Sequence, residues 1–250
     1  MLRWLTAFID LPAGAAAPAE AFWHAVTATT PSPRRGERAQ FVTLLPASGD
    51  SFLRAQTVLD GAGGGHLDLH VDAPEEFAGR ALALGAVERF RESGLVVLSS
   101  PAGVGFCAVR HDASGRGEAV RPSPVIRDDG TRSLVDQVCL DVPADGYERE
   151  CEFWAALTGW PLRSGSRPEF RYLERPPGMP LRILLQRLHS GSAGLHLDLA
   201  CDDVDAEAAV HEALGATRVR AHPNWITMHD PAGLLYCLTR RNPDTGSLPA

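Results

Sequence analysis

Apolar and polar positions along the chain follow two periods, and each period predicts one kind of element. Alternating apolar residues over 4–11 and 134–142 predict β-strands, whose side chains point to opposite faces in turn. Ala-rich segments that carry a Phe-Trp pair, at 15–28 and 147–157, predict helices that bury this pair in the core. Shorter apolar runs predict further strands, over 39–45, 52–58, 95–99, 106–110, 170–174, 181–188, 225–228 and 234–239.

Each half of the chain also contains a His-Leu-Asp-Leu run, which is typical of a strand that leads into a helix. Asp72 in the first half and the pair Asp202-Asp203 in the second are predicted N-caps of these helices, because an Asp side chain accepts hydrogen bonds from the first free backbone N–H groups. Gly85 and Gly215, each within a Leu-Gly-Ala sequence, are predicted to end the same helices.

The two halves repeat one another. Residues from Leu5 align with residues from Asp136 at an offset of 131, and further along the alignment continues at an offset of 130 without a gap for roughly 55 residues. Agreement of this length indicates duplication. We predict one domain at 1–111 and a second at 133–241. A linker rich in Gly, Pro, Ser and charged residues joins them at 112–132, and a flexible tail follows at 242–250.

The overall charge and hydropathy exclude several classes of partner. A net charge of −7 argues against a nucleic-acid-binding protein, because phosphate binding needs a basic face. No apolar run approaches the roughly 18–20 residues that cross a bilayer, and the first apolar run is too short for a signal peptide. We therefore expect a cytoplasmic protein with no nucleic-acid or membrane partner.

The basic residues and the cysteines exclude further chemistry. All 24 basic residues are arginine, which is typical of a GC-rich bacterium. Without lysine the chain has neither a Schiff-base nucleophile nor a P-loop lysine. The five cysteines form no C-x-x-C pair and are odd in number, so we expect buried thiols rather than a disulfide framework.

The repeated residues resemble those of the vicinal oxygen chelate superfamily, which holds glyoxalase I, extradiol dioxygenases and bleomycin- and fosfomycin-resistance proteins. The resemblance rests on the Phe-Trp pair, on His-Leu-Asp-Leu with an Asp after it, on Leu-Gly-Ala, and on the Asp-Pro-Ala-Gly-Leu-Leu-Tyr-Cys run that ends at Cys237. It is strongest to the glyoxalase-like, bleomycin-resistance-like subgroup. The resemblance implies an α+β fold of two tandem domains, each with two βαβββ modules that form an open eight-stranded cup for a small molecule.

Metal-dependent members of that superfamily take ligands from the first and last strands of each module. The resemblance places Thr6, Gln56, His66 and Cys107 at these positions in the first copy, and Gln137, Gln186, His196 and Cys237 in the second. Neither set contains the two His and one carboxylate that suit non-haem iron, or the His/Glu mixture that suits zinc or nickel. We therefore assign no cofactor, and a divalent metal on the second set is the alternative.

Without a metal, the same side chains are expected to line a pocket for an organic ligand. Residues two apart on a strand share a face, so His196 and Asp198 lie on one side. A carboxylate beside an imidazole raises the imidazole pKa and fixes the ring, which suits a general base. The other interpretation is that His196 is a hydrogen-bonded core residue. We predict His196 and Asp198 as catalytic residues. The predicted ligand-binding residues are Gln137, Gln186, Cys237, Trp225, Tyr172, Gln56, His66, Asp68 and His70.

Several functions remain open on the sequence. The first is an enzyme that binds a small organic metabolite and carries out metal-independent isomerase or lyase chemistry with His196. The second is a binding protein that sequesters an antibiotic-like molecule without changing it. A divalent-metal-dependent lyase or dioxygenase, and a structural protein whose second copy replaces a homodimer partner, are the others. Fold membership does not choose among them, and the chain is expected to be a monomer or a homodimer.

Overall fold

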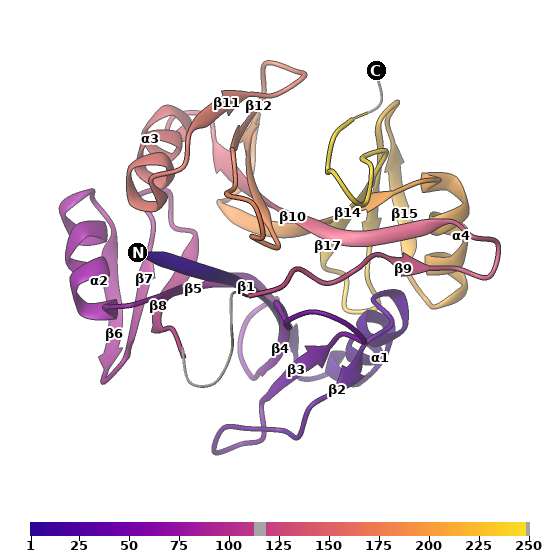
Figure 1. Cartoon of the computed structure of the whole chain (residues 1–250), viewed down its shortest axis with the longest axis horizontal. Coiled ribbons are helices and arrows are strands. Elements are labelled where there is room, and N and C mark those ends of the chain that lie inside the picture. The colour runs from indigo at the N-terminus through magenta and orange to yellow at the C-terminus, as the bar shows by residue number, and fades with distance from the viewer. Residues whose placement is uncertain (113–118, 249–250) are drawn as a thin grey trace. The chain divides into compact units, whose positions relative to one another are not determined.

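The computed structural model describes residues 1–112 and 119–248, so residues 113–118 of the predicted linker and the last two residues of the tail lie outside it. The first copy forms a sheet with the strand order β2-β3-β4-β1-β5-β8-β7-β6 (Figure 1). Its strands are β1 (Leu2–Pro12), β2 (Thr30–Pro31), β3 (Phe41–Leu45), β4 (Leu53–Val58), β5 (Gly64–Val71), β6 (Val87–Glu92), β7 (Leu95–Ser99) and β8 (Gly105–Arg110).

The second copy forms a sheet with the corresponding order, β11-β12-β13-β10-β14-β17-β16-β15, and one short extra strand, β9, pairs with β10. Its strands are β9 (Val125–Ile126), β10 (Arg132–Pro143), β11 (Leu162–Ser164), β12 (Phe170–Leu173), β13 (Arg182–Leu188), β14 (Gly194–Cys201), β15 (Thr217–Ala221), β16 (Trp225–His229) and β17 (Leu235–Thr239). The matching orders confirm the predicted α+β fold of two tandem domains, each built from two βαβββ modules.

Each module has one helix. Within residues 1–112 and 119–248 the helices are α1 (Ala16–Val26), α2 (Pro74–Ala83), α3 (Tyr147–Thr158) and α4 (Val204–Ala213). Helix α2 contacts β7 and β8 within the first sheet, as Figure 1 shows. Gly85 and Gly215 follow α2 and α4 with φ angles of +103° and +100°, a conformation that glycine adopts without strain. The two predicted helix ends are therefore confirmed.

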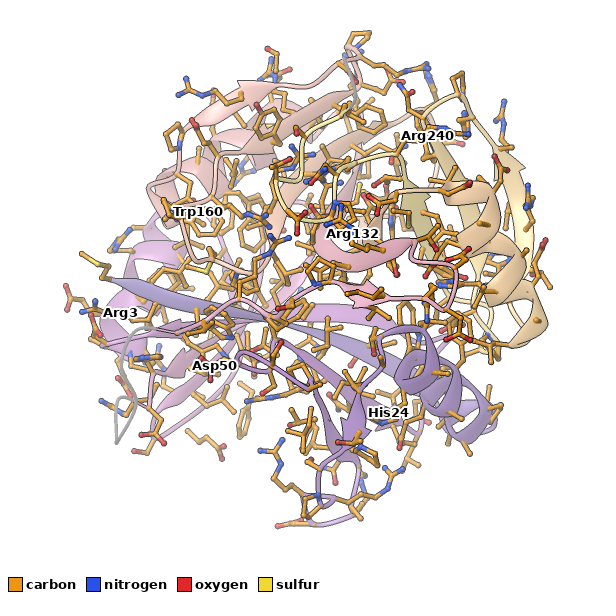
Figure 2. The ribbon with its side chains drawn as sticks, turned by 45° about the vertical axis from the view of Figure 1, so that its right-hand side comes forward. Arg3, His24, Asp50, Arg132, Trp160 and Arg240 are labelled. Carbon is orange, nitrogen blue, oxygen red and sulfur yellow. The ribbon has the colours of Figure 1, made fainter. Side chains whose placement is uncertain are left out.

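The predicted caps are correct at only one of the two helices. Asp203 caps α4, and its side chain accepts from the backbone N–H groups of residues 205 and 206. The prediction for Asp72 is wrong, because α2 begins after Ala73 with a proline at its first position. The Asp72 carboxylate instead accepts from Arg3 at 2.9 Å, and Asp202 makes the equivalent pair with Arg132, labelled in Figure 2, at 2.8 Å. These two aspartates fasten the first strand of each copy.

The outermost strands β6 and β15 were not predicted. All their residues are exposed, and their sequences, Val-Glu-Arg-Phe-Arg-Glu and Thr-Arg-Val-Arg-Ala, are rich in charge. Each has a register irregularity against its neighbour, between Glu88 and Phe90 in β6 and between Arg218 and Arg220 in β15. Charged side chains and bulges prevent edge strands from pairing with other molecules. The same features leave these strands without an apolar periodicity, so the sequence pattern did not predict them.

The chain divides into two compact units that do not follow the two sequence copies. Unit 1 consists of Met1–Phe8, Gly65–Val120 and Val138–Leu195, and unit 2 consists of Ile9–Gly64, Arg121–Gln137 and His196–Ala250. Each unit therefore contains one module from each copy. The long strands β1 and β10 run from one unit into the other.

Inside unit 2, helix α1 of the first copy packs on the last module of the second copy. The indole N–H of Trp23 donates to Asp230 Oδ2 at 2.8 Å, and the ring packs edge-on against Tyr236 with centroids 5.3 Å apart. Asp230 Oδ1 also accepts from the backbone of Ala232 and Leu234 and so shapes the Pro-Ala-Gly turn. These side chains are buried, as predicted for the Phe-Trp pair.

Inside unit 1, helix α3 of the second copy packs in the same way on the first copy. The indole N–H of Trp154 donates to Glu150 Oε1 at 2.8 Å, and Glu150 Oε2 accepts from the backbone of Ala102 at 2.9 Å. Trp154 also lies edge-on to Phe106, with centroids 5.2 Å apart. Each Phe-Trp pair therefore fills the core of a unit that two copies share.

The described part of the predicted tail has specific partners. Arg132 donates to the Asp244 carboxylate at 2.6 Å, and Arg121 donates to the Asp244 carbonyl at 2.8 Å. The backbone of Asn242 and Ser247 forms a further hydrogen bond of 2.8 Å.

Among the helices of the described residues, none is long and apolar enough to cross a membrane.

Candidate functional site

The same strand pairing places a His-x-Asp sequence beside a cysteine in each copy. Strands β5 and β8 run parallel with Asp68 opposite Cys107, and β14 and β17 run parallel with Asp198 opposite Cys237. All five cysteines are buried thiols, as predicted. The two copies therefore share this strand arrangement. The residues around it differ, so each copy forms a different group of polar side chains.

The second copy contributes a chain of buried polar residues to unit 2. The imidazole Nδ1 of His196 lies 3.0 Å from Asp198 Oδ1, which is an ion-pair distance, but the two atoms are not aligned as a hydrogen bond. The other oxygen of Asp198 accepts from the Gln137 amide, and the Gln137 carbonyl accepts from Arg241. Arg241 also donates to Asp136 Oδ2 at 2.6 Å and to the carbonyl of Gly246 at 2.8 Å. The five side chains of this polar chain are Asp136, Gln137, His196, Asp198 and Arg241.

Burial makes this polar chain rigid. Asp136 is 0% exposed, Gln137 and Asp198 are 2% exposed, and Arg241 is 3% exposed. His196, the last of these five polar side chains, is 9% exposed. Buried charges are stable only when they are paired. Each of the five side chains is therefore held in position by its neighbour. The arrangement holds the Asp198 carboxylate beside the His196 imidazole, where it would stabilise a positive charge on the ring.

Sequence reasoning missed Arg241 and Asp136, although a signal was present. At the aligned positions the first copy has His111 and Leu5, so the buried ion pair exists only in the second copy. An acidic residue within the apolar run of a predicted strand and an arginine just after the last strand are both unusual in a core. Together they could have indicated a pair.

The first copy contributes a different group to unit 1. One ligand atom each of His66, Asp68 and Cys107 lie within 4.8 Å of one another. The His66 ring stacks on Phe8, with centroids 4.3 Å apart and an angle of 14° between the planes. The Thr6 hydroxyl lies 2.9 Å from Nε2 of His70, which is on the same strand as His66. His66 and His70 are both partly exposed.

This group fits a divalent metal better than the set that the resemblance implied. A nitrogen, a carboxylate oxygen and a sulfur are the ligands that zinc takes, and three protein ligands leave the fourth position open. Asp68 enters the group in place of Gln56, which lies on β4 in unit 2.

The remaining predicted ligand-binding residues are divided between the units. Gln186, on β13 in unit 1, accepts from the Cys139 thiol at 3.7 Å. Tyr172, on β12 in the same unit, lies beneath the Arg182 guanidinium at 4.5 Å. Trp225, on β16 in unit 2, stacks on His222, with centroids 4.1 Å apart. Cys237 in unit 2 lies 3.8 Å from the Thr227 hydroxyl.

Comparison with protein-family models gives two matches. The model of the glyoxalase-like domain matches residues 6–109 and again residues 137–239. The chain belongs to the glyoxalase-like domain family. The two matches cover both sheets and confirm the tandem arrangement. A comparison of this glyoxalase-like protein with curated protein sequences finds no significant match.

Solved structures share the fold at low sequence identity. A variant of 4-hydroxymandelate synthase from Streptomyces coelicolor has a TM-score of 0.64 and 15% identity, with 99% of this chain and 95% of that chain covered. The enzyme 2,2',3-trihydroxybiphenyl 1,2-dioxygenase from Sphingomonas wittichii strain RW1 has a TM-score of 0.62 and 14% identity, with 96% of this chain and 90% of that chain covered. A variant of homoprotocatechuate 2,3-dioxygenase from B. fuscum has a TM-score of 0.64 and 13% identity, with 99% of this chain and 73% of that chain covered. The glyoxalase-like protein therefore has the same fold over nearly its whole length.

Proposed function

We propose that the glyoxalase-like protein is an enzyme that binds a small oxygenated organic metabolite and carries out acid–base chemistry, of the isomerase or lyase type, at His196. The polar chain from Arg241 to His196 is the observation that carries this proposal. An oriented imidazole with a carboxylate on one nitrogen is the arrangement that a general base needs. The neighbours in the comparison are named for oxygenated aromatic compounds, and we extend that class of ligand to this chain.

In this proposal each member of the polar chain has one task. The Asp198 carboxylate, 3.0 Å from Nδ1, would stabilise the positive charge that the His196 imidazole gains when it accepts a proton from a carbon next to a carbonyl group of the ligand. The imidazolium then returns this proton to another atom of the ligand, which completes an isomerisation, or to a leaving group, which completes an elimination. Gln137 and Arg241 position Asp198 and do not contact the ligand.

The test is a screen of oxygenated aromatic and keto acids for compounds that raise the melting temperature, followed by NMR detection of product for each hit. We expect His196→Ala to lower turnover about 100- to 10,000-fold and to leave binding of the hit in place. His189→Ala, a change at an exposed histidine of the second copy, is expected to keep wild-type turnover. Binding without product in the wild-type protein would contradict an enzyme and favour a sequestering protein.

A second candidate function rests on the group of His66, Asp68 and Cys107. We propose that these residues hold a divalent metal of the zinc class, on the evidence of their three close ligand atoms. A metal held there would supply Lewis-acid polarisation of a ligand oxygen. His66, stacked on Phe8, would keep a fixed ring orientation, and the partly exposed face would admit a ligand.

Metal content measures this second candidate directly. We expect about one equivalent of zinc per chain by mass spectrometry after purification without chelator, and loss of most of it in Asp68→Asn and Cys107→Ser. Cys237→Ser, the matched change in the second copy, is expected to keep the metal. Metal-free wild-type protein, or equal loss in all three variants, would exclude the proposed site.

A further inference from the structure

Two arginines of unit 2 lie beside the same threonine, on strands β3 and β4. Thr43 of β3 is directly opposite Arg54 of β4. The guanidinium of Arg35, in the loop before β3, donates to the Thr43 hydroxyl at 2.6 Å. Thr43 itself is 6% exposed, whereas Arg35 is exposed and Arg54 is half-buried. The two arginines are therefore the accessible part of this cluster, and the threonine anchors one of them.

The cluster is on the face of the sheet that points away from helix α1. On the other face, Leu44 and Leu53 are at most 3% exposed, and Val26 of α1 lines the same internal space as these two leucines. Successive side chains of a strand point to opposite faces. Thr43 and Arg54 each lie next to one of the leucines in sequence, so their side chains point away from the helix.

The neighbouring pair of residues on this face adds an aromatic ring and an amide. Phe41 is directly opposite Gln56, and these residues lie two positions from Thr43 and Arg54. The four side chains therefore share one face. Phe41 and Gln56 are both half-buried, and the sequence predicted Gln56 to bind a ligand. The face thus combines an apolar ring and an amide group with two positive charges.

The loop before β3 holds Arg35 in place. The backbone N–H of Arg35 donates to the Phe41 carbonyl at 2.9 Å, and the N–H of Phe41 donates to the Arg35 carbonyl at 3.1 Å. Between them, the N–H of Ala39 donates to the Gly36 carbonyl at 3.0 Å. Ala39 has a φ of +52°, which is uncommon for a residue with a side chain. Such a conformation persists only where the surrounding structure holds it, so the loop is fixed before a ligand binds.

The Arg35 guanidinium has no acidic partner among residues 1–112 and 119–248. The adjacent Arg34 does have one, since it donates to the two oxygens of Glu20 at 2.9 and 2.8 Å. Arg35 makes one side-chain hydrogen bond, to Thr43, and a guanidinium has five N–H groups. The remaining N–H groups can donate to an anion. A planar carboxylate matches the fork of a guanidinium, because it accepts two parallel hydrogen bonds.

Unit 1 has no arginine at the two corresponding positions. There the backbone hydrogen bond to the carbonyl of Phe170 comes from Gly165, as the one to Phe41 comes from Arg35. Leu184 of β13 aligns with Arg54 at the offset of 130. The same sheet therefore forms with glycine and leucine at these positions, and the fold does not require the two arginines.

We propose that Arg35, Arg54 and Gln56 form a binding site for the carboxylate group of a small organic acid, whose apolar part lies against Phe41. Arg35 donates two parallel hydrogen bonds to the carboxylate. Arg54 adds the second positive charge, and Gln56 adds an amide N–H. The site shares no residue with the polar chain that ends at His196, so binding of an acid here does not depend on the chemistry proposed there.

Benzoate and benzamide test this site in the full-length protein, because they share a ring and differ in charge. In the wild-type protein, benzoate is expected to shift the Nε–H signals of Arg35 and Arg54 in NMR spectra and to bind about tenfold more tightly than benzamide. Arg35→Met and Arg54→Met are each expected to weaken benzoate binding about tenfold, the effect of one charge-assisted hydrogen bond, and to leave benzamide binding unchanged.

Two further variants separate a built site from general attraction to positive charge. Arg38→Met is the matched control, because Arg38 is exposed in the same loop, and it is expected to change benzoate binding less than about twofold. Arg35→Lys keeps the charge and loses the planar fork, so it is expected to bind benzoate nearly as weakly as Arg35→Met. Equal losses in Arg38→Met, wild-type binding in Arg35→Lys, or binding of inorganic phosphate at these arginines in place of benzoate would each overturn the proposal.

Discussion

Replacement of Arg241 by methionine is expected to destabilise the protein by about 3–5 kcal/mol. The guanidinium bridges Asp136 and Gln137, and both the arginine and the aspartate are almost completely buried. Without it, the buried Asp136 carboxylate loses the guanidinium that pairs with it at 2.6 Å, and a buried charge without its ion-pair partner costs more than the lost hydrogen bonds alone. The measurement is the midpoint of urea-induced unfolding at pH 7.

Two further variants separate the lost charge pair from a general loss of packing. Arg241→Met combined with Asp136→Leu is expected to recover most of the stability, because it replaces the pair by apolar residues and the first copy already has a leucine at the position of Asp136. Arg240→Met is the matched control. Arg240 is half-exposed and pairs with Asp205 at 3.2 Å at the surface, so its loss is expected to cost less than about 1 kcal/mol. If the double variant were less stable than Arg241→Met, the buried pair would not be the cause.

The second large effect is expected when the two copies are separated. Each unit contains modules from both copies, so a fragment of residues 1–112 or 119–250 lacks half of each core. In the first fragment Trp23 loses Tyr236 and Asp230, and Phe106 loses Trp154. Buried aromatic residues contribute about 3–5 kcal/mol each, and a typical domain has only about 5–15 kcal/mol in total. Neither fragment is therefore expected to fold as a monomer.

A protease site inserted between residues 113 and 118 provides the experiment. After cleavage, the two fragments are expected to stay associated and to show one cooperative unfolding transition. After separation in denaturant, each alone is expected to lose its near-ultraviolet circular dichroism, and mixing is expected to restore it. A fragment that folds alone as a monomer would show that the sequence copies, and not the two units, are the folding domains.

The sequence predicted the elements that have apolar periodicity, and it failed where other forces decide. The internal repeat and the Phe-Trp helices carry a strong pattern because each packs one face in a core. Strands β6 and β15 carry none, because an exposed edge strand buries no face. Asp72 and Asp203 occupy similar places before a helix, yet the proline after Ala73 and the competing Arg3 decide that only Asp203 caps.

The candidate sites were predictable in their residue types and not in their grouping. The His-x-Asp spacing placed each His and Asp on one face, since this follows from strand geometry alone. The partners of these residues depend on how modules pack, and Asp68 joining Cys107 or Arg241 reaching Gln137 are tertiary contacts. An alignment of one copy with the other likewise cannot show which modules pack together in one unit. It compares residues at matching positions and gives no information on which modules are in contact.

The joining of two copies in one chain has a consequence for stoichiometry. In a symmetric dimer of identical subunits, any substitution appears twice, so sites arise in pairs. Here Glu207, His211 and Tyr236 lie at positions where the first copy has Phe77, Ala81 and Phe106, and all six are buried. The second copy therefore has polar side chains at these three positions, and the first copy has apolar ones. A fused pair of copies can therefore hold a single copy of each site per molecule, and one half can lose or change a site while the other keeps its own.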